Sequence, residues 1–89
     1  MVEGPMEWFV YIAETPTNHY YIGISPDPIK RMVLHNNGQG SLMARQQGPF
    51  QLVHMSPPFA NKSDARKREI QLKGWSKEKK RKLISGQWV

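Results

Sequence analysis

Cysteine is absent from the 89-residue sequence. Its absence excludes disulfides, zinc sites with thiolate ligands and catalytic cysteine nucleophiles. Long apolar runs are also lacking, and no segment approaches the roughly 18 residues that a membrane span requires. Residues 1–7 carry acidic side chains where an export signal would be basic. We therefore expect a cytoplasmic protein.

Acidic residues are scarce. Seven Asp and Glu residues stand against 13 Lys and Arg residues, which gives a formal net charge of +6 and a pI near 9.9. This excess favours a polyanionic partner, DNA or RNA before an anionic membrane surface. Charge can also serve solubility alone, so it indicates a class of partner and not an activity. At this length we expect one domain over residues 1–89.

Three segments are typical of β-strands. Residues 7–14 and 19–25 are rich in aromatic and branched side chains. Proline and asparagine lie between them, in residues 15–18, and are typical of a turn, so a β-hairpin is predicted. Residues 50–55 form a third predicted strand, which two prolines follow.

Helical signals cover residues 28–36, 63–73 and 76–84. The expected N-caps are Asp27, Ser63 and Ser76. The predicted order is ββαβαα, which indicates an α/β (α+β) sandwich with a three-stranded antiparallel sheet flanked by helices. Residues 38–50 form a long glycine-rich loop, and a loop of this length in a small domain favours a functional role.

Arg31 and His35 lie one turn apart in the first predicted helix and project on the same side. A guanidinium binds phosphate oxygens with a forked donor, and an imidazole can move a proton near neutral pH. The spacing fits a solvated helix face as well. We expect a core-facing stripe on another side of the helix, made by Ile29, Met32, Val33 and Asn36.

Glu69 falls along the stripe of the second predicted helix that should face inward, with Ala65 and Leu72. A carboxylate in that place is costly unless it has a partner. A divalent cation such as Mg²⁺, held by one carboxylate, waters and phosphate oxygens, is one such partner. A salt bridge is the other, and its candidates are Arg31, Arg66 and Lys73.

Two tyrosines of the predicted hairpin, Tyr11 and Tyr21, share a face in one strand register, which the sequence does not determine. Beside a cation and a phosphate they would orient water or, if one is deprotonated, act as a base. Packing is the other role that strand tyrosines commonly have.

Positive charge is concentrated in the last third of the chain. Ten of the 13 Lys and Arg residues lie there: Lys62, Arg66, Lys67, Arg68, Lys73, Lys77, Lys79, Lys80, Arg81 and Lys82. Such a run fits a backbone-tracking nucleic-acid surface or a solvated helix face. We take Arg66, Lys73 and Lys77 as candidate DNA contacts, together with Arg45 in the glycine-rich loop.

The order of these residues resembles a known signature. Val10-Tyr11-Ile12 followed by Tyr21-Ile22-Gly23 is similar to the two-part motif of the GIY-YIG nucleases. Asp27, Arg31, the run His35-Asn36-Asn37-Gly38 and Glu69 then succeed one another as in small stand-alone bacterial members, the UPF0213-like proteins related to the Slx1 branch. The resemblance covers about residues 7–85.

This resemblance implies a small sandwich around a three-stranded antiparallel sheet and metal-dependent hydrolysis of phosphodiester bonds. It makes Glu69 the ligand of Mg²⁺ (or Mn²⁺) and Arg31 the residue that stabilises charge on the scissile phosphate. Tyr11 and Tyr21 resemble the pair that positions or activates the attacking water, and His35 resembles the residue that assists proton transfer. Asn36 and Gly38 match positions that end the helix.

We therefore predict an endonuclease acting on duplex or branched DNA, with structure selectivity suited to repair or recombination. A protein partner that supplies specificity would be typical of such systems. The alternative is a nucleic-acid-binding module without catalysis, because a motif is no proof of turnover. The sequence does not determine the oligomeric state.

Overall fold

The computed structural model describes residues 6–36 and 49–86. Its elements in chain order are β1 (Phe9–Glu14), β2 (Tyr20–Ser25), α1 (Pro28–Leu34), β3 (Gln51–Met55), α3 (Lys62–Lys73) and α4 (Lys77–Ile84). The predicted order ββαβαα is confirmed. No helix of these residues is long and apolar enough to cross a membrane.

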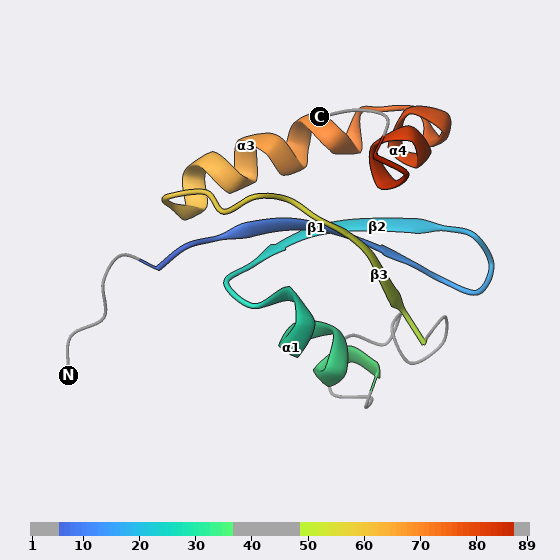
Figure 1. Cartoon of the computed structure of the whole chain (residues 1–89), viewed down its shortest axis with the longest axis horizontal. Coiled ribbons are helices and arrows are strands. Elements are labelled where there is room, and N and C mark those ends of the chain that lie inside the picture. The colour runs from blue at the N-terminus through green and yellow to red at the C-terminus, as the bar shows by residue number, and fades with distance from the viewer. Residues whose placement is uncertain (1–5, 37–48, 87–89) are drawn as a thin grey trace.

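The three strands form one antiparallel sheet with the order β2-β1-β3. Helix α1 covers one face of the sheet, while α3 and α4 lie on the other face (Figure 1). The predicted three-stranded sandwich is therefore confirmed. Because β1 is central, β2 is an edge strand with one side unpaired in the sheet.

The hairpin register places both tyrosines on one face. Asn18 takes the left-handed conformation (φ 66°) that the turn needs. In the ladder that follows, Tyr11 pairs with Gly23 and Ala13 pairs with Tyr21. Directly opposite residues point to the same face of a sheet, so Tyr11 and Tyr21 both lie on the α1 side.

Each face of the sheet has its own hydrophobic cluster. On the α3 and α4 side the buried members are Val10, Ile12, Ala65, Leu72 and Leu83. On the α1 side the buried members are Tyr11, Ala13, Met32 and Phe50. Alternation along β1 thus supplies both layers, because successive side chains point to opposite faces.

The predicted stripe of α1 is wrong in part. Met32 is buried, but Ile29 is 62% and Val33 53% exposed. The short helix meets the sheet along Pro28 and Met32, one turn apart, which turns the expected neighbours outward. Asn36 is exposed as well, although its side chain bonds the backbone of Phe50.

The caps are predicted correctly in two helices of three. Asp27 and Ser76 accept hydrogen bonds from the third residue after each of them, Lys30 and Lys79. The prediction of Ser63 as a cap is wrong. Asn61 caps α3 instead, since its Oδ1 accepts from the Asp64 amide at 2.8 Å and the helix starts at Lys62.

Candidate active site

A pocket of about 520 Å³ opens at the edge strand β2. Its lining includes the successive residues 21–25 of that strand, together with residues of β1, α1 and α3. Successive strand residues point to opposite faces, so the pocket wraps around the edge of the sheet. It thereby joins the layer of α1 to the layer of α3.

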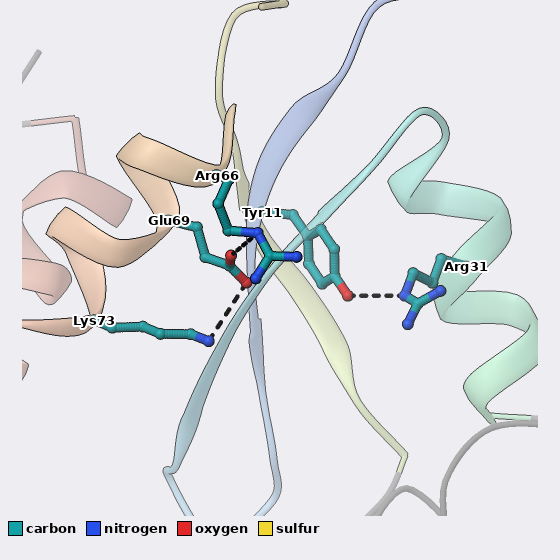
Figure 2. Close-up of polar contacts among 5 residues, drawn as sticks. All are labelled: Tyr11, Arg31, Arg66, Glu69 and Lys73. Carbon is teal, nitrogen blue, oxygen red and sulfur yellow. Dashed lines mark hydrogen bonds and ion pairs between the residues drawn. The ribbon is translucent and has the colours of Figure 1, made fainter. Parts of the chain in front are cut away.

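Tyr11 reaches from the central strand to α1 across the face of β2. Its hydroxyl oxygen accepts a hydrogen bond from Arg31 Nε at 3.2 Å (Figure 2). Gly23, its partner in the ladder, has no side chain in the path of the ring. The absence of a Cβ at this position therefore permits the contact.

Arg31 presents the rest of its guanidinium to the pocket. It is exposed on α1, and no carboxylate of the residues described forms an ion pair with it. With Nε engaged by Tyr11, the two Nη groups remain as forked donors of the kind that bind phosphate oxygens. Arg31 is therefore held in place but not neutralised.

His35 lies one turn beyond Arg31 and lines the same pocket. Burial and, to a smaller extent, the charge of Arg31 lower the pKa of His35 below its usual 6.5. Its Nδ1 is buried and has no hydrogen-bond partner among the described residues. At pH 7 the ring is therefore neutral and able to accept a proton.

Phe50 supports the aromatic wall of the pocket, which we define as the rings of Tyr11, Tyr21, His35 and Phe50. Its ring stacks on Tyr21 with centroids 5.2 Å apart and lies 6.2 Å from the ring of His35. The Asn36 side chain fixes its backbone, accepting from the Phe50 amide at 2.7 Å and donating to its carbonyl at 2.8 Å. This clamp joins the end of α1 to the start of β3.

Glu69 faces the pocket from α3. Its burial with Ala65 and Leu72 confirms the predicted stripe, and its side chain is only 9% exposed. Oε1 lies 3.5 Å from Arg66 Nε, and Oε2 lies 3.4 Å from Lys73 Nζ (Figure 2). The salt-bridge alternative is thus realised with Arg66 and Lys73, one turn on either side, and not with Arg31.

The carboxylate nevertheless suits a divalent cation. Oε1 of Glu69 is buried and accepts no hydrogen bond from the described residues, although Arg66 Nε lies 3.5 Å from it. In the part of the chain that the structure describes, no three His, Cys, Asp or Glu side chains gather to hold a metal. Mg²⁺ commonly takes one or two protein carboxylates and completes its shell with waters and phosphate oxygens. One under-bonded carboxylate in a pocket fits that pattern.

The charge of the pocket favours an anion. Three cations in its lining, Arg31, Lys62 and Arg66, stand against one carboxylate, Glu69, so the lining has a net charge of +2 (three minus one). The Lys62 ammonium also lies 5.2 Å from the centroid of the Trp8 ring. A phosphate backbone is an anion that such a site accommodates.

The structure brings most of the predicted site residues together. Tyr11, Tyr21, Arg31, His35, Glu69 and Arg66 all line the pocket. Lys73 contacts Glu69 but does not line the pocket. Lys77 lies away from the pocket, with its Nζ 5.7 Å from the centroid of the Tyr20 ring. Arg45 lies outside the described residues.

Sequence reasoning missed the contributions of Lys62 and Phe50 to the pocket. Lys62 was one of ten clustered cations, and no local pattern separates it from the others. Phe50 begins the predicted strand 50–55, and the strand pattern gives no sign of a place in a pocket. Gly23 carried the one usable signal, since a glycine within a strand permits close approach of another group.

Comparisons with known proteins converge on one family. A family model described as the GIY-YIG catalytic domain matches residues 7–82. A UPF0213 protein of Vibrio cholerae serotype O1 is 37% identical over 86 residues, which cover 97% of this chain and 85% of that protein. A UPF0213 protein of Staphylococcus saprophyticus is 42% identical over 77 residues, covering 86% of this chain and 93% of that protein.

A solved structure is similar as well. The solution NMR structure of a UPF0213 protein from Bacillus halodurans has 35% sequence identity and a TM-score of 0.56, and the match covers 90% of this chain and 84% of that one. The family match contains every residue that lines the pocket.

Proposed function

This chain belongs to the GIY-YIG catalytic domain family, a family of nucleases, and from that membership we propose that it is a divalent-cation-dependent endonuclease that hydrolyses phosphodiester bonds in DNA. The observation that carries the proposal is the pocket at β2. It combines an unneutralised arginine, a neutral histidine and an under-bonded buried carboxylate in a lining of net positive charge.

Binding of the scissile phosphate falls to Arg31. Its Nη groups donate to non-bridging oxygens, and their charge opposes the negative charge that builds on phosphorus during attack. The bond from Nε to the Tyr11 hydroxyl fixes the plane of the guanidinium before substrate arrives. Preorganised charge of this kind costs no reorganisation in the transition state.

Preparation of the attacking water falls to the aromatic wall. The Tyr11 oxygen accepts from Arg31, so its own hydrogen remains to be donated to water or phosphate. Tyr21, stacked on Phe50, borders the same space. His35 is neutral at pH 7 and accepts the proton that the water loses on attack.

Glu69 would hold the divalent cation, Mg²⁺ or Mn²⁺, through its under-bonded carboxylate. When bound there, such an ion would neutralise charge on the phosphate and on the leaving oxygen. We further propose that DNA shape, in duplex or branched substrates, decides which bond is cut. The support is that the lining carries Arg31, Lys62 and Arg66, and cations suit backbone phosphates, which carry no sequence information directly.

The test is cleavage of labelled single-stranded, duplex, flap and branched DNA with Mg²⁺, Mn²⁺ or a chelator, for wild type and Glu69→Ala. We expect cation-dependent cutting by wild type and its loss in the variant, with the circular dichroism spectrum retained. The matched control is Glu78→Ala, which removes an exposed carboxylate that is paired with Lys82 on α4, and it should cut as wild type does.

Undiminished cutting by Glu69→Ala would contradict the assignment of the carboxylate. Salt-sensitive DNA binding without any cutting by wild type would favour the non-catalytic binding module instead. Activity that appears only on addition of a cell extract would point to a protein partner.

A further inference from the structure

The ion pairs around Glu69 join one buried group to two exposed ones. The carboxylate side chain is 9% exposed, whereas those of Arg66 and Lys73 are 56% and 57% exposed. Both contacts are longer than charge-assisted hydrogen bonds, which measure about 2.7–2.9 Å. The two cations can therefore move away from the carboxylate without exposing the core, but Glu69 then needs another partner, because an unpaired buried charge is costly.

Helix geometry places the two cations on either side of the carboxylate. Arg66 precedes Glu69 by three residues and Lys73 follows it by four, so all three share one face of α3. Seven residues of α-helix separate the backbone positions of Arg66 and Lys73 by about 10.5 Å along the axis, so side chains that leave Glu69 can diverge. Two cations so placed would contact different phosphates of a strand that runs along α3.

Local charge opposes entry of a metal ion on its own. Arg66 and Lys73 outnumber the single carboxylate that they contact, and Arg31 adds a further positive charge across the pocket. A divalent cation must displace or oppose these groups to reach Glu69. Phosphates change that balance, because they offer the two side chains new partners and bring negative charge to the pocket.

We propose that Arg66 and Lys73 exchange partners during substrate binding: they neutralise Glu69 in the free protein and move to DNA phosphates when substrate enters, which frees the carboxylate for the divalent cation. This inference rests on the proposed function. It makes Arg66 and Lys73 positioning residues with two opposed effects, weakening the affinity of the free protein for metal and strengthening its affinity for DNA.

The experiment compares wild type with the double variant Arg66→Gln/Lys73→Gln in two equilibrium measurements. Binding of Mn²⁺ without DNA, followed by electron paramagnetic resonance, should be roughly threefold to tenfold tighter in the variant, because two exposed ion pairs no longer compete. Binding of a labelled duplex in chelator, followed by fluorescence anisotropy, should be weaker. The slope of log K against log salt concentration should fall by roughly 1.8 in magnitude, the value for two phosphate contacts.

The matched control is Lys67→Gln/Lys82→Gln, which removes the same net charge but neither contact to Glu69. Its affinity for Mn²⁺ should stay within about twofold of wild type, because neither lysine contacts Glu69 and solvent screens exposed charges. An affinity of Arg66→Gln/Lys73→Gln for Mn²⁺ that is unchanged or weaker, or no measurable Mn²⁺ binding by any of the proteins, would overturn the proposal. An equal decrease in the slope of log K against log salt concentration in the control variant would also overturn it.

Neither measurement requires turnover, so the two proposals fail separately. Opposed effects on metal and DNA in a protein that never cuts would support the exchange and contradict the nuclease. Efficient cutting by wild type with unaltered Mn²⁺ affinity in the double variant would contradict the exchange alone.

Discussion

The ring of Tyr11 occupies the space that a side chain at Gly23 would fill. The two residues are direct partners in the β1–β2 ladder. A Cβ atom built on Gly23 would lie 2.5 Å from the Tyr11 hydroxyl oxygen and 2.7 Å from Cζ. The path of Tyr11 to Arg31 therefore depends on one missing side chain in the edge strand.

Gly23→Ala should displace the Tyr11 ring and break its bond to Arg31. Because Tyr11 is buried, with 6% exposure, we expect a loss of about 1–3 kcal/mol in the free energy of unfolding, as for other overpacked sites. Cleavage should fall further than stability explains. Urea unfolding and cleavage at a temperature where the variant is fully folded measure the two effects.

The control is Gly74→Ala at the end of α3. Among the residues that the structure describes, a Cβ there meets only the Gln71 carbonyl oxygen, at 3.5 Å, an ordinary contact. Equal losses in the two alanine variants would show that the clash with Tyr11 is not the cause.

Arg31→Lys should abolish most activity although the charge is kept. Lysine lacks the forked donor, so it cannot hold Tyr11 and bind two phosphate oxygens together. We expect turnover to fall by about 10²-fold, as on removal of one preorganised donor. The free energy of unfolding should change by less than about 1 kcal/mol, because the position is exposed. Single-turnover cleavage measures the loss, Lys30→Arg serves as the control, and wild-type rates in Arg31→Lys would refute this role.

Cleavage should decline in acid as His35 becomes protonated. Burial and Arg31 lower its pKa below 6.5, so the neutral, proton-accepting form persists at pH 7 and is lost only as pH falls through that lowered value. The free energy of unfolding should change in the same direction as activity. It is highest above pH 6.5 and falls as the pH drops through the lowered pKa of His35, because the unfolded chain binds the proton more readily. A pH–rate profile and an NMR titration of the His35 ring provide the measurement.

His54 offers the comparison for that profile. Burial and the charge of Arg68 lower its pKa too, yet it does not line the pocket. His54→Gln should keep the acid limb of the rate profile, while His35→Gln should remove both the limb and most of the activity. An acid limb that survives in His35→Gln would exclude His35 as the base.

Asn36→Ala should make the aromatic wall less rigid, although Asn36 is not part of that wall. It removes both hydrogen bonds to the Phe50 backbone, and we expect a loss of about 1–3 kcal/mol in the free energy of unfolding. Near-ultraviolet circular dichroism should report a weaker Tyr21–Phe50 stack. Gln51→Ala, an exposed change next to Phe50, should be neutral, and a neutral Asn36→Ala would show that the clamp is dispensable.

Local signals in the sequence predicted the elements well. Asp27 and Ser76 cap helices because each hydrogen bond depends on residues three apart. The same rule predicted Ser63 wrongly as the N-cap of α3. Asn61 also precedes this helical segment, and the two residues compete for one helix start. The exposed side of α1 was predicted wrongly because periodicity alone does not say which residues of a seven-residue helix meet the sheet.

The site depended on tertiary relationships that spacing leaves open. Either partner of Glu69, a salt bridge or a cation, fits its position among basic residues, and only the fold shows which side chains reach it. The register that places Tyr11 opposite Gly23 is also tertiary information, because a shift of one residue would send the tyrosine to the other face. The sequence therefore supplied the chemistry of the pocket, and packing supplied its geometry.

Arg31 and His35 come from the helix on one face of the sheet, and Glu69 comes from a helix on the other. Neither layer alone contains the groups required by the proposed reaction. A copy that is newly synthesised, damaged or partly unfolded, with one layer undocked, would be inert toward the genome. Nuclease activity would then appear only in fully folded molecules, in which both helical layers are packed against the sheet.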